Sequence, residues 1–253
     1  MEITEIPAQR YDTGKGFNPV KEWVVSEKKY QIFINKTEIA LISGSPDMVR
    51  ELAVGYLVGG GFLNLDDITT IEVSENTVYV ACEKPADVIV KHMRSSDCSS
   101  HWISEIVAKE KIVQSSLAVP AEVILHSVSQ LQSDTQTWKK THAVHSAGLF
   151  SGCGDVKLLV EDISRHNAFD KIVGKALLEK YDVSSAFVAL SGRITQDMVI
   201  KAGNVGIPLI ASRSTVIEPA VTVASALGIC VIGYTRGQHL VVFSHPERVR
   251  VEG

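Results

Sequence analysis

Residues 161–174, EDISRHNAFDKIVG, concentrate side chains that can bind or move charge. The apolar run KLLV precedes them and KALLEKY follows, which predicts a strand that passes directly into a helix. In layered α/β proteins such a joint lies at the carboxyl end of a strand, where ligands bind. We therefore expect these polar residues at the ligand edge of a sheet.

Sulfur chemistry is the second possibility, because the chain has four widely spaced cysteines and no CxxC pair. Cys98 lies in the polar stretch SSDCSSHW, which predicts a loop where a thiolate is accessible, and His101 could lower its pKa or relay a proton. Cys153, in the turn SGCGD, is the second candidate. Cys82 and Cys230 lie in apolar runs and are expected to be packing residues.

Metal and nucleotide motifs are absent from the sequence. His142 and His145 in THAVHSA are predicted on one strand, where their spacing puts them on opposite faces. No HxE followed by PCxxC occurs, which opposes a zinc-deaminase site, and neither GxxxxGK[ST] nor GxGxxG is present. We expect no resident metal.

Composition indicates a cytoplasmic globular protein with reduced thiols. The 253 residues carry a net charge of −4, with 45% apolar and 21% charged residues, so nucleic acid is not an expected partner. The longest apolar stretches are too short to span a membrane, and the amino terminus lacks the apolar segment of a signal peptide.

The first half of the chain predicts an α+β unit. A hairpin is expected over residues 29–43, followed by a helix capped by Ser45, begun by Pro46 and ended by the glycines at 59–61. Two paired strands follow at 68–73 and 76–83, then the polar loop at 91–105.

The second half alternates between strands and helices. Strands are expected at 143–151, 157–162, 185–192, 207–212, 229–237 and 239–244, and helices at 120–134, 166–181, 195–206 and 217–228. This order predicts a sheet with helices on both faces. The strands end in EDISRHN, SGRIT, SRST and YTRGQH. Arginines in converging turns indicate an anion site, although solvated loop charges give the same pattern.

The polar joint resembles the signature ED-x-G-RHNA-x-DK-x-x-G of the FdhD/NarQ family of formate dehydrogenase accessory sulfurtransferases. Residues 34–63 are similar to the family's amino-terminal block, and 233–249 to its carboxyl-terminal block. THAVHSA stands where the family has TGGxHAA, and LSGRITQDMVIKA where it has SGRxSxEMVxKA. The similarity is collinear from about residue 25 to residue 248.

This resemblance implies a cytidine-deaminase-like three-layer α/β/α domain at 113–253 and a smaller α+β domain at 1–112, in a cytoplasmic homodimer. It implies a sulfurtransferase that takes persulfide sulfur from a cysteine desulfurase. The sulfur passes to the molybdenum cofactor, bis-molybdopterin guanine dinucleotide, for formate dehydrogenase. The cofactor is then a bound substrate rather than a permanent group.

The resemblance also implies roles for particular residues. The family's CGxC loop matches CSSH, so Cys98 stands for the persulfide carrier and His101 replaces the second cysteine. We assign both to catalysis. The family's contact with the cofactor maps onto YTRGQH, and the other polar turns complete the expected set. The predicted cofactor contacts are Tyr234, Thr235, Arg236, Gly237, Gln238, His239, Arg165, His166, Asn167, Arg193, Ser212 and Arg213.

Several positions depart from the family pattern. TGG is replaced by Thr141-His142-Ala143, the signature glycine by Ser164, and SAPT by Ser214-Thr215-Val216-Ile217. These changes suit either an active divergent sulfurtransferase or a chaperone that binds the molybdenum cofactor without transferring sulfur. A deaminase-like hydrolase is a third reading, opposed by the missing zinc ligands. For Asp170 and Lys171 we expect a position on a helix surface or a role in structural ion pairs.

Overall fold

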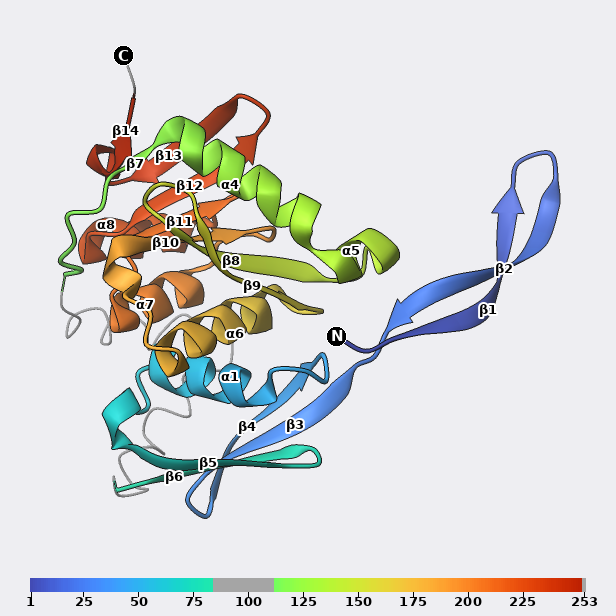
Figure 1. The fold of residues 1–253 in the computed structure, drawn as a ribbon, viewed down its shortest axis with the longest axis horizontal. Helices are drawn as coiled ribbons and strands as arrows, with labels where there is room; N and C mark the ends of the chain where they lie inside the picture. The colour runs from blue at the N-terminus through green and yellow to red at the C-terminus, as the bar shows by residue number, and fades with distance from the viewer. Residues whose placement is uncertain (84–111, 252–253) are drawn as a thin grey trace.

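A six-stranded mixed sheet forms the larger part of this computed structural model, which describes residues 1–83 and 112–251 (Figure 1). The strand order is β13-β12-β11-β10-β8-β9, in which β10, β11 and β12 are parallel. The strands are β8 (His145–Ser151), β9 (Val156–Asp162), β10 (Ala186–Leu190), β11 (Leu209–Ser212), β12 (Cys230–Arg236) and β13 (His239–Ser244).

Helices cover both faces of this sheet, as the strand–helix alternation predicted. One face packs against α6 (Arg165–Leu178), α7 (Gln196–Val205) and α8 (Glu218–Leu227), and the other against α4 (Ala121–Asp134). The short α5 (Gln136–Thr141) follows α4. The three-layer α/β arrangement is therefore confirmed, while its relation to the cytidine-deaminase fold stays an expectation.

A second, four-stranded sheet has its own apolar core below the first. Its order is β4-β3-β6-β5, and the predicted hairpin and paired strands are both present. The strands are β3 (Lys28–Ile34), β4 (Thr37–Gly44), β5 (Ile68–Ser74) and β6 (Thr77–Cys82). The predicted division of the chain at residues 112 and 113 stays a prediction, since the preceding stretch is outside the described residues.

The helix between these strands begins later than the sequence predicted. α1 (Val49–Val54) starts after Met48, whose left-handed φ of 54° interrupts any helix begun at Pro46. Ser45 does not cap it, because the Ser45 hydroxyl is buried and bonded to charged side chains of the larger unit. The chain continues as a π-helical turn, Gly55–Gly59, and ends at the predicted glycines.

α1 and α6 cross in direct backbone contact and join the two sheets. A Cβ atom on Gly55 would lie 1.8 Å from the Asp170 carbonyl oxygen, and one on Gly174 would lie 1.9 Å from that of Glu51. Only glycine permits this approach at either position. The last residue of the polar signature is therefore a packing requirement.

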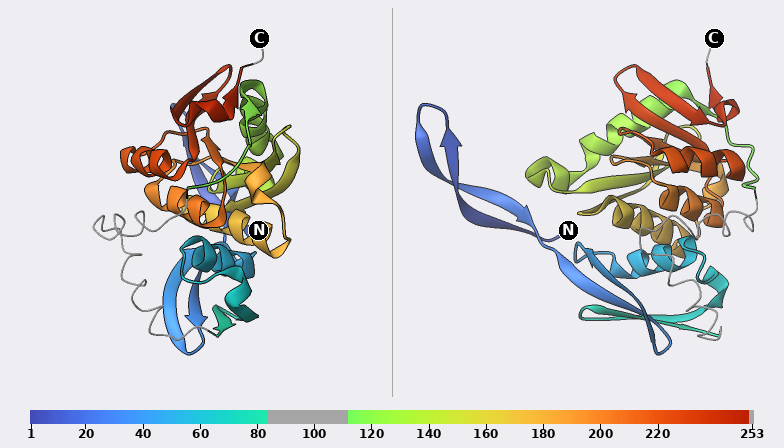
Figure 2. Two further views of the ribbon diagram at one scale, coloured as in Figure 1. Left: turned by 90° about the vertical axis from the view of Figure 1, so that its left-hand side faces the viewer. Right: turned by 180° about the vertical axis from the view of Figure 1, so that it is seen from behind.

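An amino-terminal ribbon was not predicted from the sequence. β1 (Ile3–Asp12) and β2 (Gly16–Val25) form a two-stranded antiparallel sheet. Figures 1 and 2 show it projecting far from the rest of the molecule. Short elements complete the described fold: β7 (Val119–Pro120), β14 (Val249–Arg250), and 3₁₀ turns at Leu65–Asp67, Val183–Ser185 and Pro246–Arg248.

Candidate functional site

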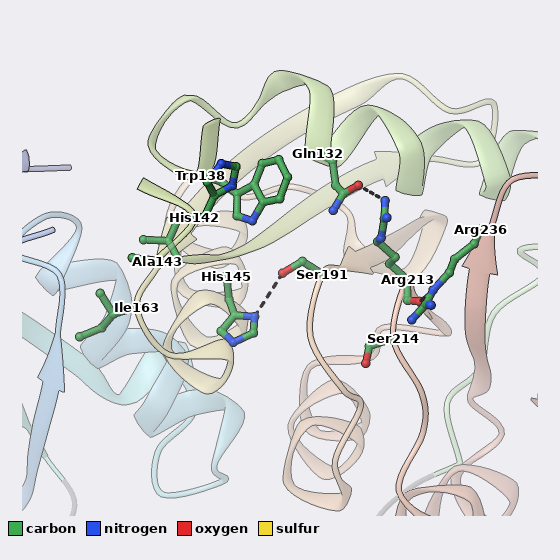
Figure 3. Close-up of a pocket in the computed structure, with 11 residues that line it drawn as sticks. Gln132, Trp138, His142, Ala143, His145, Ile163, Ser191, Arg213, Ser214 and Arg236 are labelled. Carbon is green, nitrogen blue, oxygen red and sulfur yellow. Dashed lines mark hydrogen bonds between the residues drawn. The ribbon is translucent and has the colours of Figure 1, made fainter. Parts of the chain in front are cut away.

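A pocket of about 400 Å³ opens where the parallel strands end. Its lower wall consists of residues that follow β9, β10 and β11, end β12 or begin β8, and its upper wall comes from α4, α5 and the segment between α5 and β8 (Figure 3). The convergence predicted from the four polar turns is therefore present in the fold. The lining residues are Gln132, Trp138, His142, Ala143, Val144, His145, Ile163, Ser191, Arg213, Ser214 and Arg236.

Two arginines make one side of the pocket cationic. Arg236 Nε donates to the carbonyl oxygen of Arg213 at 2.9 Å, which holds the end of β12 against the end of β11. The Arg213 guanidinium donates to the side-chain oxygen of Gln132 on α4. Guanidinium groups bind phosphate and carboxylate through paired hydrogen bonds. This side of the pocket suits an anionic ligand. One donor of the Arg213 guanidinium is bonded to the Gln132 oxygen, so an anion would compete with Gln132 for it.

The opposite side is aromatic and is positioned by the first residue of the signature. Glu161 accepts hydrogen bonds from the backbone N–H groups of Thr137 (3.0 Å) and Trp138 (2.8 Å), which caps the start of α5. The His142 ring meets the Trp138 ring edge-on, with centroids 4.7 Å apart. Glu161 thus orients the aromatic wall without contacting the pocket.

His142 corrects one prediction from the sequence. It precedes β8 and ends α5 in the left-handed region, at φ 52°, so it does not share a strand with His145. Both histidines line the same pocket. The family pattern has glycine at this position, which the left-handed backbone explains. By contrast, Ser164 has φ −107°, so its position does not require the glycine of the signature.

His145 is the titratable group at the centre of the pocket. Its Nδ1 lies 3.4 Å from Ser191 Oγ, and that hydroxyl accepts the Ser146 N–H at 2.9 Å. Burial, together with the nearby Arg165 and Arg193, lowers the pKa of His145. The imidazole is therefore neutral at pH 7 and able to accept a proton.

His166 lies beside the pocket rather than in its lining. Its Nε2 is 3.2 Å from Thr195 Oγ1, and burial and the Arg165 charge lower its pKa to about 4. Arg165 itself packs against Gly192, in the turn after β10. Neither of these two predicted contacts lines the pocket; both pack beside the turn after β10, to which the lining residue Ser191 belongs.

The middle of the signature forms a buried polar joint with the smaller sheet. Asp162 is fully buried and lies 2.7 Å from Lys171 Nζ, which is also fully buried. The same carboxylate accepts from the Ser45 hydroxyl (2.8 Å) and the Asn167 amide (3.0 Å). Lys171 also contacts Asp47 at 3.1 Å. Asp162 is therefore the acceptor on which segments far apart in sequence converge.

A second buried ion pair involves Asp170, the residue of α6 next to Lys171. Lys201 Nζ donates to both carboxylate oxygens of Asp170, at 2.8 and 2.9 Å, and reaches Asp197 at 3.2 Å. Burial lowers the pKa of Lys201, but these two carboxylates raise it more, so its pKa lies above the ordinary lysine value. Asp170 and Lys171 thus each belong to a buried ion pair with another residue, as the structural alternative predicted, and the alternative of a helix surface is wrong because both are buried.

Two predicted cofactor contacts have structural roles instead. Asn167 is buried and donates to the Ser43 carbonyl at 2.7 Å, away from the pocket. Ser212 is buried and donates to the Gly192 carbonyl at 2.6 Å, which ties two turns together below the pocket. Asn167 therefore joins the two sheets and Ser212 joins two turns, and neither residue lines the pocket.

The carboxyl-terminal turn contributes Arg236 alone to the lining. Thr235 is buried, whereas Tyr234 is exposed with a left-handed φ of 52°. Gly237, Gln238 and His239 are exposed in the β12–β13 turn, and Arg193 is exposed in the turn after β10. A ligand larger than the pocket would reach these residues; their assignment as contacts stays a prediction.

Cys98 and His101 lie outside the described residues, so their catalytic assignment stays a prediction. Cys153 is exposed in the β8–β9 turn, at the end of β8 remote from His145, with Sγ 3.3 Å from Asp155. Cys82 and Cys230 are buried, as expected, and burial raises the pKa of Cys230 to about 12.

Sequence reasoning missed most of the upper wall of the pocket. Gln132 and Trp138 belong to α4 and α5, which carry no motif. His145, Ser191 and Ser214 lie in segments that match family motifs. Their positions at the ends of predicted strands could have identified them as pocket residues. Within residues 1–83 and 112–251, no three His, Cys, Asp or Glu side chains are grouped for metal binding.

Comparison with known proteins identifies the chain. The FdhD/NarQ family model matches residues 25–250. This chain belongs to the FdhD/NarQ family. It is 32% identical to the sulfur carrier protein FdhD of Methanothermobacter thermautotrophicus over 247 residues, which covers 97% of this chain and 98% of the relative. The sulfur carrier protein FdhD of Bacillus subtilis is 30% identical over 253 residues, covering 95% of each.

A solved structure also matches almost the whole of this chain. It is the crystal structure of a protein from Desulfotalea psychrophila described as a formate dehydrogenase accessory protein. The TM-score is 0.82 at 26% identity, with 98% of this chain and 99% of that chain covered. Among the helices of the described part, none is long and apolar enough to cross a membrane.

Proposed function

We propose that this chain is a sulfur carrier that moves persulfide sulfur from a cysteine desulfurase to the molybdenum cofactor of formate dehydrogenase, with Cys98 as the carrier. The observation that carries the proposal is the pocket where the parallel strands end, with Arg213 and Arg236 on one side. A guanine dinucleotide presents phosphates to such arginines and a flat base to aromatic rings. The names of the relatives support the sulfur-carrying part.

The pocket suits one nucleotide end of the cofactor. Its volume of about 400 Å³ lies in the usual range for small-molecule sites, about 300–1,000 Å³. Arg213 and Arg236 would hold phosphate, while Trp138 and His142 would pack against the base. A ligand longer than the pocket would extend past the exposed turn at Gly237.

The first chemical step needs a thiolate and a donor persulfide. The Cys98 thiolate attacks the outer sulfur of the desulfurase persulfide, forming a Cys98 persulfide and releasing the desulfurase thiolate. Transfer of this sulfur to the cofactor as sulfide takes two electrons, supplied either by a reduced acceptor or by an external thiol reductant that becomes a disulfide, and it returns the Cys98 thiolate. Because His101 replaces a second cysteine, no internal disulfide completes the release.

Sulfur labelling tests the carrier role. After incubation with a cysteine desulfurase and ³⁵S-cysteine, we expect thiol-releasable label on the wild type and on Cys153→Ala, and none on Cys98→Ala. Cys153→Ala is the matched control because it removes an exposed thiol at the other end of β8. Absence of label on the wild type would contradict the carrier role and favour the alternative of a chaperone that binds the cofactor. Loss of label in Cys153→Ala but not in Cys98→Ala would assign the carrier role to Cys153.

Binding of GDP tests the pocket separately. Arg213→Ala should weaken GDP binding by about 10- to 100-fold, since a charge-assisted hydrogen bond contributes about 1.5–3 kcal/mol. Gln132→Glu should also weaken it, because a carboxylate would pair with Arg213 and repel phosphate. Lys139→Ala removes a charge from α5 outside the lining and should change affinity less than threefold. Titration calorimetry measures all four proteins; equal losses in all variants would contradict the site.

A further inference from the structure

His142 has a backbone conformation that a residue with a side chain adopts only at a cost. It ends α5 at φ 52° and ψ 16°, in the left-handed region, where the family pattern has glycine. Glycine enters this region freely, whereas a Cβ atom is crowded there. Such outliers gather at ligand sites, where the strain accompanies a function. The end of the helix requires the backbone conformation but not the imidazole, so the ring needs a separate explanation.

The imidazole ring is held against Trp138 by contacts within α5. The His142 N–H donates to the Trp138 carbonyl oxygen at 2.8 Å. The two rings meet edge to face, with centroids 4.7 Å apart and planes at 87°, which is a favourable arrangement for aromatic pairs. Glu161 holds the start of the same helix through the N–H groups of Thr137 and Trp138. This aromatic wall of Trp138 and His142 is therefore in place without a ligand.

The aromatic wall faces a cationic wall across the pocket. His142 is exposed and Trp138 is half-buried, and both line the cavity. Figure 3 shows these two rings on one side and Arg213 and Arg236 on the other. A ligand that contacts both walls needs a flat ring at one end and negative charge at the other. A nucleoside diphosphate has this chemistry, because its base stacks on aromatic side chains and its phosphates pair with guanidinium groups.

We propose that His142 is a specificity-determining residue, which together with Trp138 makes this chain prefer a nucleoside diphosphate to a bare diphosphate. The inference rests on the proposed function, because it takes the pocket as the site for the nucleotide end of the cofactor. It deepens that function by assigning affinity for the base to a side chain that the family pattern lacks. Arg213 and Arg236 contribute to both ligands, whereas the imidazole ring contributes only to the ligand that carries a base.

Titration calorimetry of the full chain with GDP and with inorganic pyrophosphate tests this role. In His142→Gly the dissociation constant for GDP should rise about tenfold, while that for pyrophosphate should change less than about twofold, because pyrophosphate has no base to stack. The matched variant is His142→Asn, which tolerates the left-handed backbone and keeps a polar side chain but has no ring. It should lose the same affinity for GDP. The melting temperatures of both variants should stay close to that of the wild type.

Three outcomes would overturn the role of His142 and leave the nucleotide pocket in place. They are unchanged affinity for GDP in both variants, equal losses for GDP and pyrophosphate, and a loss for GDP in His142→Gly alone. The last would mean that a hydrogen bond, rather than the ring, holds the ligand. A wild type that binds neither GDP nor pyrophosphate would contradict the nucleotide pocket itself, and the role of His142 with it.

Discussion

Gly174→Ala lowers the free energy of unfolding by about 3–5 kcal/mol, which places it among severe single substitutions. The new Cβ would lie 1.9 Å from the Glu51 carbonyl oxygen and within 2.7 Å of the Gly55 nitrogen. Backbone atoms cannot move aside as a flexible side chain does, so α1 and α6 must separate. For a chain of this size the melting temperature should fall by roughly 10 °C.

Gly59→Ala is the control for this effect. It lies in the same helical segment, but its Cβ would meet the Lys201 side chain at 3.4 Å, an ordinary contact. We expect its free energy of unfolding to change by less than about 1 kcal/mol, because alanine is the better helix former. Urea unfolding followed by circular dichroism compares the variants. Equal stabilities of the two alanine variants would refute the close crossing.

Lys171→Met destabilises the protein by about 3–5 kcal/mol through a different mechanism. It leaves the fully buried carboxylate of Asp162 without its cation, 2.7 Å away in the wild type. Breaking one partner of a buried pair leaves an uncompensated charge, which is more harmful than replacing both. The loss should appear in urea unfolding as a lower midpoint with an unchanged slope.

Two further variants separate charge from packing. Lys171→Met/Asp162→Asn should be more stable than the sum of the single changes by at least about 1 kcal/mol, since neither charge remains unpaired. Lys175→Met, one turn farther along α6, breaks a partly exposed pair 3.9 Å from Glu179, and should change stability by less than about 1 kcal/mol. Strict additivity in the double variant would contradict the pairing.

The polar signature illustrates what the local sequence pattern could predict about the site. Its position between a strand and a helix placed it at the ligand edge of the sheet, and the pocket lies there. Its arginine and histidine lie beside the pocket, against Gly192 and Thr195. Its Glu161, Asp162, Asn167 and Gly174 act by contacts with α5, Ser45, Ser43 and α1, at separations of up to 124 residues. Such partners cannot be read from residue types alone.

The amino-terminal ribbon is a part of the fold that the sequence pattern did not predict. Strands are recognised when one face is buried and alternates with a polar face. In β1 and β2 both faces are largely exposed, and Pro7 and Pro19 weaken the strand signal. The start of α1 was misplaced for a related reason: Ser45 resembles a cap in sequence, but its hydroxyl serves the buried Asp162.

The sequence by itself determined the order of strands and helices in the main sheet, the edge at which polar turns meet, and the family. These follow from periodicity and short motifs, which are local properties. Only the tertiary structure decided which side chains line the pocket, why Glu161 and Gly174 stand where they do, and that an amino-terminal ribbon projects from the body. Those features depend on which distant surfaces meet, and contacts between segments remote in sequence leave no local period.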